Sequence, residues 1–249
     1  MLSSEAKPAD SGGERIAKIL ARAGVASRRD VEKMILAGRV AVNGELLTTP
    51  ACILTGGEYI TVDGKPIAAA EATRLWRCHK PRNVMITHKD PEGRPTLFEI
   101  LPKNLPRIVS VGRLDFPSEG LILLTNDGEL ARGLELPSKG WRRVYRVRVF
   151  GAIPQEKLAA LAGGIEIDGV KYGAIEAQLD SQRGDNAWLT VTLTEGKNRE
   201  IRKIIEFLGG QVTRLIRVSY GPFQLGLLPP GGVDEIASKQ IQGLGLRTK

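Results

Sequence analysis

The stretch Val111-Gly-Arg-Leu-Asp115-Phe-Pro-Ser-Glu-Gly-Leu-Ile-Leu-Leu-Thr-Asn-Asp-Gly128 decides the fold of the larger part of the chain. It contains an apolar strand, then Arg113 and Asp115, then a turn with Pro and Gly, and then a second apolar strand. Residues two apart on an extended chain point to the same side, so we expect Arg113 and Asp115 to share a cleft. In an arbitrary sequence, however, an R-x-D triplet is usually a turn aspartate beside a surface arginine.

Short β-rich runs on both sides of this stretch predict an α+β domain. They lie at residues 75–78, 108–111, 121–125, 144–150, 188–193 and 212–218. Only two helices are predicted among them, over residues 154–161 and 198–208. So few helices cannot connect the strands of a doubly wound parallel sheet, and we therefore expect a mixed, mostly antiparallel sheet.

The N-terminal part has a different pattern, typical of a small helix-helix-hairpin module. Residues 14–23 have helical spacing, and Ser27 with Asp30 forms a capping box that opens a second helix. Asn43-Gly44 and Asp63-Gly64 are strong hairpin-turn signals. Residues 68–72 are small and featureless, so the sequence predicts a flexible tail over 1–13, a module over 14–72 and a larger domain over 73–249.

The charge of the 249-residue chain is concentrated in two places. The formal net charge is +8 and the isoelectric point is near 9.6, which suggests a polyanionic partner. Residues 15–39 carry a net charge of +5, and so do residues 139–149. Aromatic residues make up only 5% of the chain, so we expect binding through phosphate contacts more than through stacking.

Several kinds of chemistry have no support in the sequence. It lacks G-x-x-x-x-G-K-S/T, a strand-to-helix G-x-G-x-x-G, H-E-x-x-H and G-x-S-x-G. Its two cysteines and two histidines do not have zinc spacing, so no metal site is predicted. The N-terminus is not a signal peptide and no apolar run approaches the length of a membrane helix, so we expect a reduced, cytoplasmic protein.

The stretch quoted first resembles the signature of the RsuA/RluB/RluE/RluF family of ribosomal RNA pseudouridine synthases, G-R-L-D-x-x-T-x-G-L-L-L-L-T-N-D-G. The module over 14–72 resembles the S4 RNA-binding domain in Ala21-Arg-Ala-Gly-Val-Ala-Ser-Arg-Arg-Asp30 and in Gly38-Arg-Val-Ala-Val-Asn-Gly44. The resemblance continues through residues 80–82, 144–147, 194–202 and 217–222, and covers about 14–231. It implies an S4-like domain followed by a pseudouridine synthase domain.

The resemblance also implies roles for individual residues. Asp115 falls at the catalytic aspartate, Tyr145 at the tyrosine that packs on the target base, and Arg202 at the basic partner of the aspartate. Leu215 would line the uracil pocket, and Arg113 would hold RNA around the flipped nucleotide. The basic residues expected to contact RNA are Arg15, Lys18, Arg22, Arg28, Arg29, Arg39, Lys80, Arg82, Arg142, Arg143, Lys197 and Arg199.

The implied reaction breaks the N1 to C1′ bond of uridine and rejoins the uracil through C5. Nothing is gained or lost overall, so no cofactor is expected. A carboxylate can act at C1′ as nucleophile or electrostatic stabiliser, or as a base at the 2′ position, and the sequence leaves these roles open. Each of them requires an ionised Asp115, which a fixed cation such as Arg202 would favour.

Several alternatives remain open. Residues 148–151 and the line around Ala21 resemble the RluB branch and favour 23S rRNA, free or in an assembly intermediate, over the 16S rRNA of the RsuA branch. A non-catalytic RNA-binding or ribosome-assembly factor and a helix-turn-helix DNA binder are two other classes. A glycosidase-like pair of Asp115 with Glu119 is the competing enzyme, although Glu119 is expected to be a turn residue. We expect a monomer.

Overall fold

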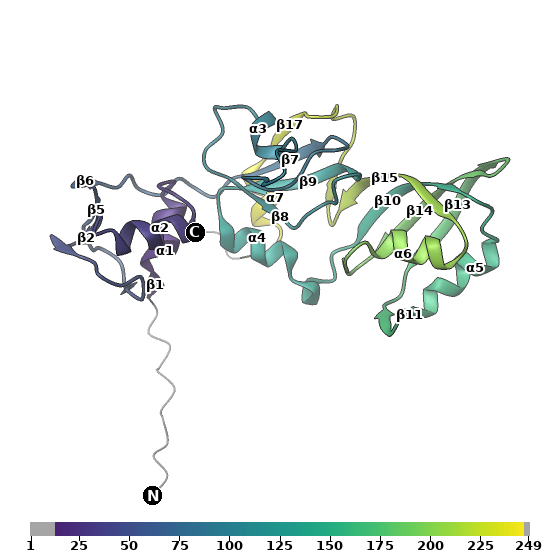
Figure 1. Ribbon diagram of the computed structural model, residues 1–249, viewed down its shortest axis with the longest axis horizontal. Coiled ribbons are helices and arrows are strands. Elements are labelled where there is room, and N and C mark those ends of the chain that lie inside the picture. Colours follow the sequence, from purple (N-terminus) through teal and green to yellow (C-terminus); the bar gives the residue numbers. More distant parts are fainter. Residues whose placement is uncertain (1–12, 247–249) are drawn as a thin grey trace, which may run out of the picture. The chain divides into compact units, whose positions relative to one another are not determined.

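The computed structural model describes residues 13–246 (Figure 1). The tail predicted over residues 1–13 lies outside the described residues except for Gly13. The chain divides into two compact units, the first ending at Ala72 and the second beginning at Thr73. Each unit has its own hydrophobic core and is described by itself.

The helices of the first unit are α1, Ile16–Arg22, and α2, Arg28–Leu36. The first begins two residues later than predicted, because β1, Glu14–Arg15, pairs instead with β4, Ile53–Leu54. The capping box of the second helix is confirmed at its Ser27 end, where the hydroxyl accepts a hydrogen bond from the backbone N–H of Asp30 at 3.1 Å. Both helices pack their apolar faces into one core.

Two hairpins form the sheet of the first unit. The strands are β2 (Val40–Val42), β3 (Glu45–Leu46), β5 (Ile60–Val62) and β6 (Lys65–Pro66), in the order β3-β2-β5-β6. Both residues of each predicted turn have positive φ, 52° and 88° at Asn43-Gly44 and 51° and 74° at Asp63-Gly64. Asn, Asp and Gly tolerate that conformation, so both predicted hairpins are confirmed.

The second unit is built on a nine-stranded sheet. Its strands are β7 (Leu75–Lys80), β8 (Val109–Val111), β9 (Glu119–Thr125), β10 (Arg143–Phe150), β13 (Glu176–Arg183), β14 (Asn186–Leu193), β15 (Gln211–Tyr220), β16 (Phe223–Gln224) and β17 (Val233–Ile236). The main path runs β13-β14-β10-β15-β9-β7-β17. Only β9 and β15 pair in parallel, so the mixed, mostly antiparallel sheet is confirmed.

The two predicted helices of this unit are present, as α5 (Gln155–Ala160) and α6 (Glu200–Phe207). Strands β13, β16 and β17 were not predicted, and neither were α3 (Leu97–Ile100), α4 (Gly128–Glu135), α7 (Ser238–Gln242) and the hairpin of β11 (Ile165–Ile167) with β12 (Val170–Tyr172). Two 3-10 turns, η1 (Pro137–Lys139) and η2 (Leu161–Gly163), complete the elements. Helix α4 was missed because Asn126-Asp127-Gly128 looks like a turn, whereas Asp127 caps the helix by accepting from the backbone N–H of Glu129 at 2.8 Å.

The nine-stranded sheet consists of two halves joined by one short contact. Helices α5 and α6 pack on β10, β14 and β15 in one core, while β7 and β9 belong to two others (Figure 1). The halves meet where β9 pairs with β15, over Glu119 with Ile216 and Gly120 with Arg217. A Cβ atom on Gly120 would lie 2.3 Å from the carbonyl oxygen of Arg217, and the φ of Gly120 is +104°. The junction therefore requires glycine at this position.

Replacing Gly120 by alanine is expected to lower the free energy of unfolding by about 2 kcal/mol or more, because the methyl group clashes with backbone and the φ is unfavourable. Urea unfolding followed by circular dichroism measures the effect. Gly163→Ala is the matched control, since that glycine has no positive φ and no neighbour within 4 Å of a new Cβ. Equal midpoints for the two variants would contradict this account of the junction.

Candidate active site

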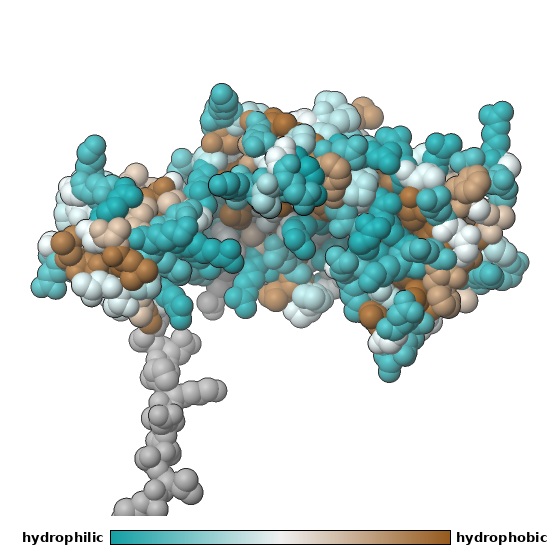
Figure 2. Space-filling view, in the orientation of Figure 1, coloured by the Kyte–Doolittle hydropathy of each residue, from teal (hydrophilic) through white to brown (hydrophobic). Residues whose placement is uncertain are grey.

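A pocket of about 390 Å³ lies at the junction of the two halves of the sheet. Its walls come from the loop after β8, the end of α4, strands β10 and β15, and the loop that enters α6. The lining residues are 112–115, Ser118, Glu135, Pro137, Arg143, Tyr145, Leu193, 195–202, Leu215, Arg217 and Tyr220. Figure 2 shows hydrophilic side chains over much of the surface between α4 and α6.

The loop that carries Asp115 is fixed at several points. The backbone N–H of Gly112 donates to Glu135 Oε1 at 2.6 Å, and the N–H of Ser118 donates to the carbonyl of Asp115 at 3.0 Å. Leu114 is buried in the core of the β10–β15 half, so the loop bridges the two halves. Asp115 is half-buried and lines the pocket together with the exposed Arg113, as their spacing predicted.

A buried lysine holds the backbone of this loop through hydrogen bonds. The Lys80 ammonium donates to the carbonyls of Ser118 at 2.6 Å, Pro81 at 3.1 Å and Phe116 at 3.3 Å. The side chain is completely buried, and burial lowers the pKa of Lys80 to about 8, against the opposing effect of Asp115. The prediction that Lys80 contacts RNA is therefore wrong, because its three N–H donors are used inside the protein.

Arg202 enters the pocket from α6. Its guanidinium donates to the Val212 carbonyl at 3.2 Å and contacts the Ser118 hydroxyl at 3.5 Å. Within residues 13–246 there is no ion pair between Arg202 and Asp115. Burial lowers the pKa of Arg202, while the charge of Asp115 opposes that shift. The two groups are thus electrostatically coupled across the pocket, and Ser118 lies between the arginine and the loop.

Tyr145 and Leu215 form the apolar wall. They lie on the neighbouring strands β10 and β15, where Tyr145 is opposite Arg217 and Leu215 is opposite Val147. Both side chains are more than nine-tenths buried and both line the pocket. An aromatic ring and a branched aliphatic side chain offer a surface on which a planar base can stack.

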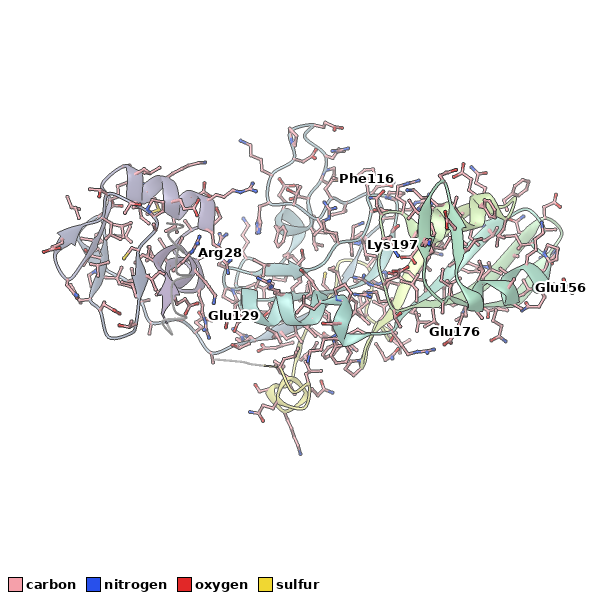
Figure 3. All side chains as sticks on the ribbon, turned by 90° about the horizontal axis from the view of Figure 1, so that it is seen from below. Arg28, Phe116, Glu129, Glu156, Glu176 and Lys197 are labelled. Atoms are coloured by element: carbon pink, nitrogen blue, oxygen red, sulfur yellow. The ribbon has the colours of Figure 1, made fainter. Side chains whose placement is uncertain are left out.

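The loop before α6 presents two more cations to the pocket, Lys197 and Arg199. Arg199 has a φ of +52°, an uncommon conformation for arginine. Glu195 holds this loop by pairing with the Lys197 ammonium and by accepting from the N–H of Gly173 at 2.7 Å. Figure 3 labels Phe116 from the Asp115 loop and Lys197 from this loop, both in the middle of the second unit.

Glu200 is a buried acidic residue in the pocket wall that was not among the site residues predicted from the sequence. One carboxylate oxygen accepts from the backbone N–H of Lys197 at 2.8 Å, and the other has no hydrogen-bond partner. The side chain is 4% exposed, and burial raises the pKa of Glu200 to about 7, with the backbone of Lys197 opposing the shift and Glu195 adding to it. In the sequence, Glu200 is the one acidic residue within the basic segment 197–202, and this contrast could have identified it as a candidate site residue.

The remaining residues that were predicted to contact RNA differ in their burial and in their ion pairs. Arg143 is buried in the pocket wall rather than on the surface, and Arg142 forms an ion pair with Glu176 at 2.6 Å. In the first unit, Lys18 pairs with Glu14 at 2.8 Å and Arg39 with Asp63 at 2.6 Å. Arg22 is half-buried, whereas Arg15, Arg28, Arg29 and Arg82 are exposed to solvent, as are the paired Arg39 and Arg142.

Glu119 cannot serve as the second carboxylate of a glycosidase. It begins β9 rather than occupying a turn, and both of its oxygens accept from Arg214, at 2.7 and 3.2 Å. The Arg214 hydrogen bonds lower the pKa of Glu119, so it is a poor proton donor. It is buried outside the pocket lining.

Residues 13–246 offer neither a metal site nor a membrane-spanning helix. This part of the chain holds no cluster of three or more His, Cys, Asp or Glu side chains suited to a metal ion. No helix within it has the length and apolar character needed to cross a membrane.

Comparison with known proteins identifies both units. Residues 74–207 match the RNA pseudouridylate synthase family, and residues 14–60 match the S4 domain. An uncharacterized RNA pseudouridine synthase of Rickettsia felis is 46% identical over 92% of this chain and 99% of its own. Ribosomal large subunit pseudouridine synthase B of Salmonella typhimurium is 44% identical over 93% of this chain and 82% of its own.

A solved structure shows the same fold. The crystal structure of a pseudouridylate synthase, 24% identical in sequence, has a TM-score of 0.64 and covers 92% of this chain and 99% of its own. The chain belongs to the RNA pseudouridylate synthase family and is a pseudouridine synthase with an S4 domain at its N-terminus.

Proposed function

We propose that this protein converts a uridine of 23S rRNA to pseudouridine, with Asp115 as the catalytic carboxylate. The similarity to ribosomal large subunit pseudouridine synthase B supports 23S rRNA as the substrate. One observation carries the proposed site. Asp115, Tyr145, Arg202 and Leu215 come from four separate segments of the chain and line a single pocket.

The surroundings of Asp115 suit the chemistry proposed for it. The reaction breaks the N1–C1′ bond, turns the uracil over, forms the C5–C1′ bond and transfers the C5 proton to solvent while N1 gains one. An ionised carboxylate acts at C1′ as nucleophile or stabiliser, or removes a proton at the 2′ position. The positive charges of Lys80 and Arg202 both interact with the Asp115 carboxyl group.

The apolar wall accounts for the proposed handling of the base. The target uridine has to leave its stack to reach Asp115, which costs a few kcal/mol. Stacking on Tyr145 and contact with Leu215 offset this cost inside the pocket. Arg113 is exposed beside Asp115, and we assign it to the RNA around the flipped nucleotide.

We assign RNA docking to residues 14–72 and catalysis to residues 73–249. The pocket is lined entirely by residues of the second unit, which supports this division. In the first unit the exposed Arg15, Arg28 and Arg29 are the best candidates for phosphate contacts. A ribosomal RNA substrate, free or in an assembly particle, places the enzyme in the cytoplasm.

Asp115→Asn is expected to reduce isomerisation about a thousandfold or more, because the carboxylate acts directly on the ribose. Tritium release from 5-tritiated uridine in 23S and 16S transcripts measures the rate, and mapping identifies the modified uridine. The control is Asp168→Asn at a turn with a φ of +49°, where asparagine is well tolerated.

Undiminished release by Asp115→Asn would refute its catalytic role, and release by the wild type from 16S RNA alone would refute the substrate. Tight binding without release from either RNA or from a pre-ribosomal particle would indicate a non-catalytic RNA-binding factor.

The double variant Arg28→Ala/Arg29→Ala is expected to weaken binding to the 23S transcript and to reduce the slope of log K against log salt concentration by about 0.7 to 0.9 for each lost phosphate contact. The rate at saturating enzyme should stay unchanged. Filter binding and single-turnover tritium release measure the two effects. Lys33→Ala on the same helix is the control, because Asp30 already pairs with that lysine at 3.3 Å. An unchanged slope in the double variant would contradict docking through α2.

Glu200→Gln is expected to change the pH dependence of stability. The folded-state pKa of Glu200, about 7, lies above the ordinary value of 4.5. Between these values the folded protein binds more protons than the unfolded chain, so the stability due to Glu200 is present below pH 4.5 and is lost as the pH rises towards 7. Glutamine carries no charge, so the variant should gain thermal stability relative to wild type at pH 8 but not at pH 5. Glu206→Gln, exposed on the same helix, should show no such pH dependence.

A further inference from the structure

Two buried arginines in the wall of the pocket lie against the ring of one tyrosine. The guanidinium carbons of Arg143 and Arg217 lie 4.8 and 5.1 Å from the centre of the Tyr220 ring. Arg143 also donates to the Tyr220 hydroxyl at 3.0 Å, and that hydroxyl donates to the Leu134 carbonyl at 2.8 Å. All three side chains line the pocket.

Neither arginine has a carboxylate partner. Arg143 and Arg217 are only 8% and 3% exposed, yet no ion pair within residues 13–246 includes either of them. Arg143 donates to the Thr194 carbonyl at 2.6 Å, and Arg217 donates through Nε to the Leu121 carbonyl at 2.7 Å. The Nη2 atom of Arg217 is buried without a hydrogen-bond partner.

The acidic residues of the pocket are engaged elsewhere. Glu135 accepts from the N–H of Gly112, Glu195 pairs with the Lys197 ammonium, and Glu200 accepts from the N–H of Lys197. Asp115 interacts electrostatically with Lys80 and Arg202. Two positive charges are therefore buried in this wall without a carboxylate partner, and a ligand that supplies negative charge would offset part of the cost of burying them.

We propose that Arg217 and Arg143, held by Tyr220, form a subsite for a phosphodiester of the substrate RNA next to the uridine at Asp115. This inference rests on the proposed function and adds a specific contact to it. A guanidinium presents paired N–H donors that match phosphate oxygens, and Arg217 lines the pocket with its Nη2 atom lacking a hydrogen-bond partner in the protein.

The strand register places this subsite beside the base. Arg217 on β15 is the direct partner of Tyr145 on β10, and Tyr220 is the partner of Arg143. Side chains that face each other across antiparallel strands lie on the same side of the sheet and within contact distance. A base stacked on Tyr145 therefore has its adjoining phosphate within reach of Arg217.

The first test compares Arg217→Met with Arg146→Met in binding to the 23S and 16S transcripts. Arg146 is the control because it lies on β10, is exposed and already pairs with Asp180 at 3.2 Å. Arg217→Met should raise Kd about tenfold and lower the salt slope by about 0.7 to 0.9, while Arg146→Met changes Kd by less than about twofold. Arg217→Lys, which keeps the charge, should recover most of the slope. An Arg217→Met slope equal to that of wild type would overturn the proposal.

The second test neutralises the phosphate instead of the arginine, so its wild-type measurement does not depend on the folding of a variant. RNA hairpins carry a single methylphosphonate on the 5′ or the 3′ side of the mapped uridine. On one side the wild type should lose about tenfold in affinity, and Arg217→Met should lose nothing further there. Loss at neither side by the wild type, or equal further loss by Arg217→Met, would overturn the subsite.

These outcomes separate the subsite from the proposed function. If the wild type releases no tritium from any RNA, the proposed substrate fails, while the salt slopes still decide whether Arg217 binds a phosphate. If tritium release is normal and the salt slopes of wild type and Arg217→Met are equal, the proposed function is supported and the phosphate subsite is refuted.

Discussion

The parallel contact between β9 and β15 is the constraint on which the rest of the second unit depends. It spans two residue pairs and is so close at Gly120 and Arg217 that no side chain fits on the glycine. The half of the sheet with β9 supplies the Asp115 loop, and the half with β15 supplies the wall of Tyr145 and Leu215 and the helix of Arg202. The pocket exists because these two halves meet at a fixed register. A change in the β9–β15 pairing would therefore also change the geometry of the site.

Charged side chains, as well as apolar packing, hold the walls of the pocket in place. The Lys80 ammonium ties three backbone carbonyls under the Asp115 loop, and the Glu195 and Glu200 carboxylates fix the loop that presents Lys197 and Arg199. Such groups lose hydration when buried, and their hydrogen bonds to backbone repay only part of that loss. They give loops without regular structure a single conformation, which a reaction that moves a base within its site requires.

Local signals in the sequence identified the elements that depend on local chemistry. The Asn-Gly and Asp-Gly hairpins, the Ser27 cap and the apolar strands follow from turn geometry and periodicity. Strand β13 was missed because Glu176–Arg183 is mostly polar and exposed, and only its pairing with β14 makes it a strand. The contact of Arg202 with Ser118 and the burial of Lys80 depend on segments far apart in the chain. A lysine or arginine within a basic stretch of sequence suggests a contact with RNA at the surface. Only the tertiary structure shows whether that side chain is exposed or buried.

The position of Arg217 late in the chain has a consequence for biosynthesis. Its guanidinium bonds to Leu121, 96 residues earlier, so the junction closes a long loop of chain. Contacts of such high sequence separation form slowly, since most of the loop must be ordered before they are rewarded. During translation the Asp115 loop emerges long before β15 does. The nascent chain therefore carries its S4 unit on the ribosome while the pocket is still missing a wall, and the pocket is complete only after β15 has emerged.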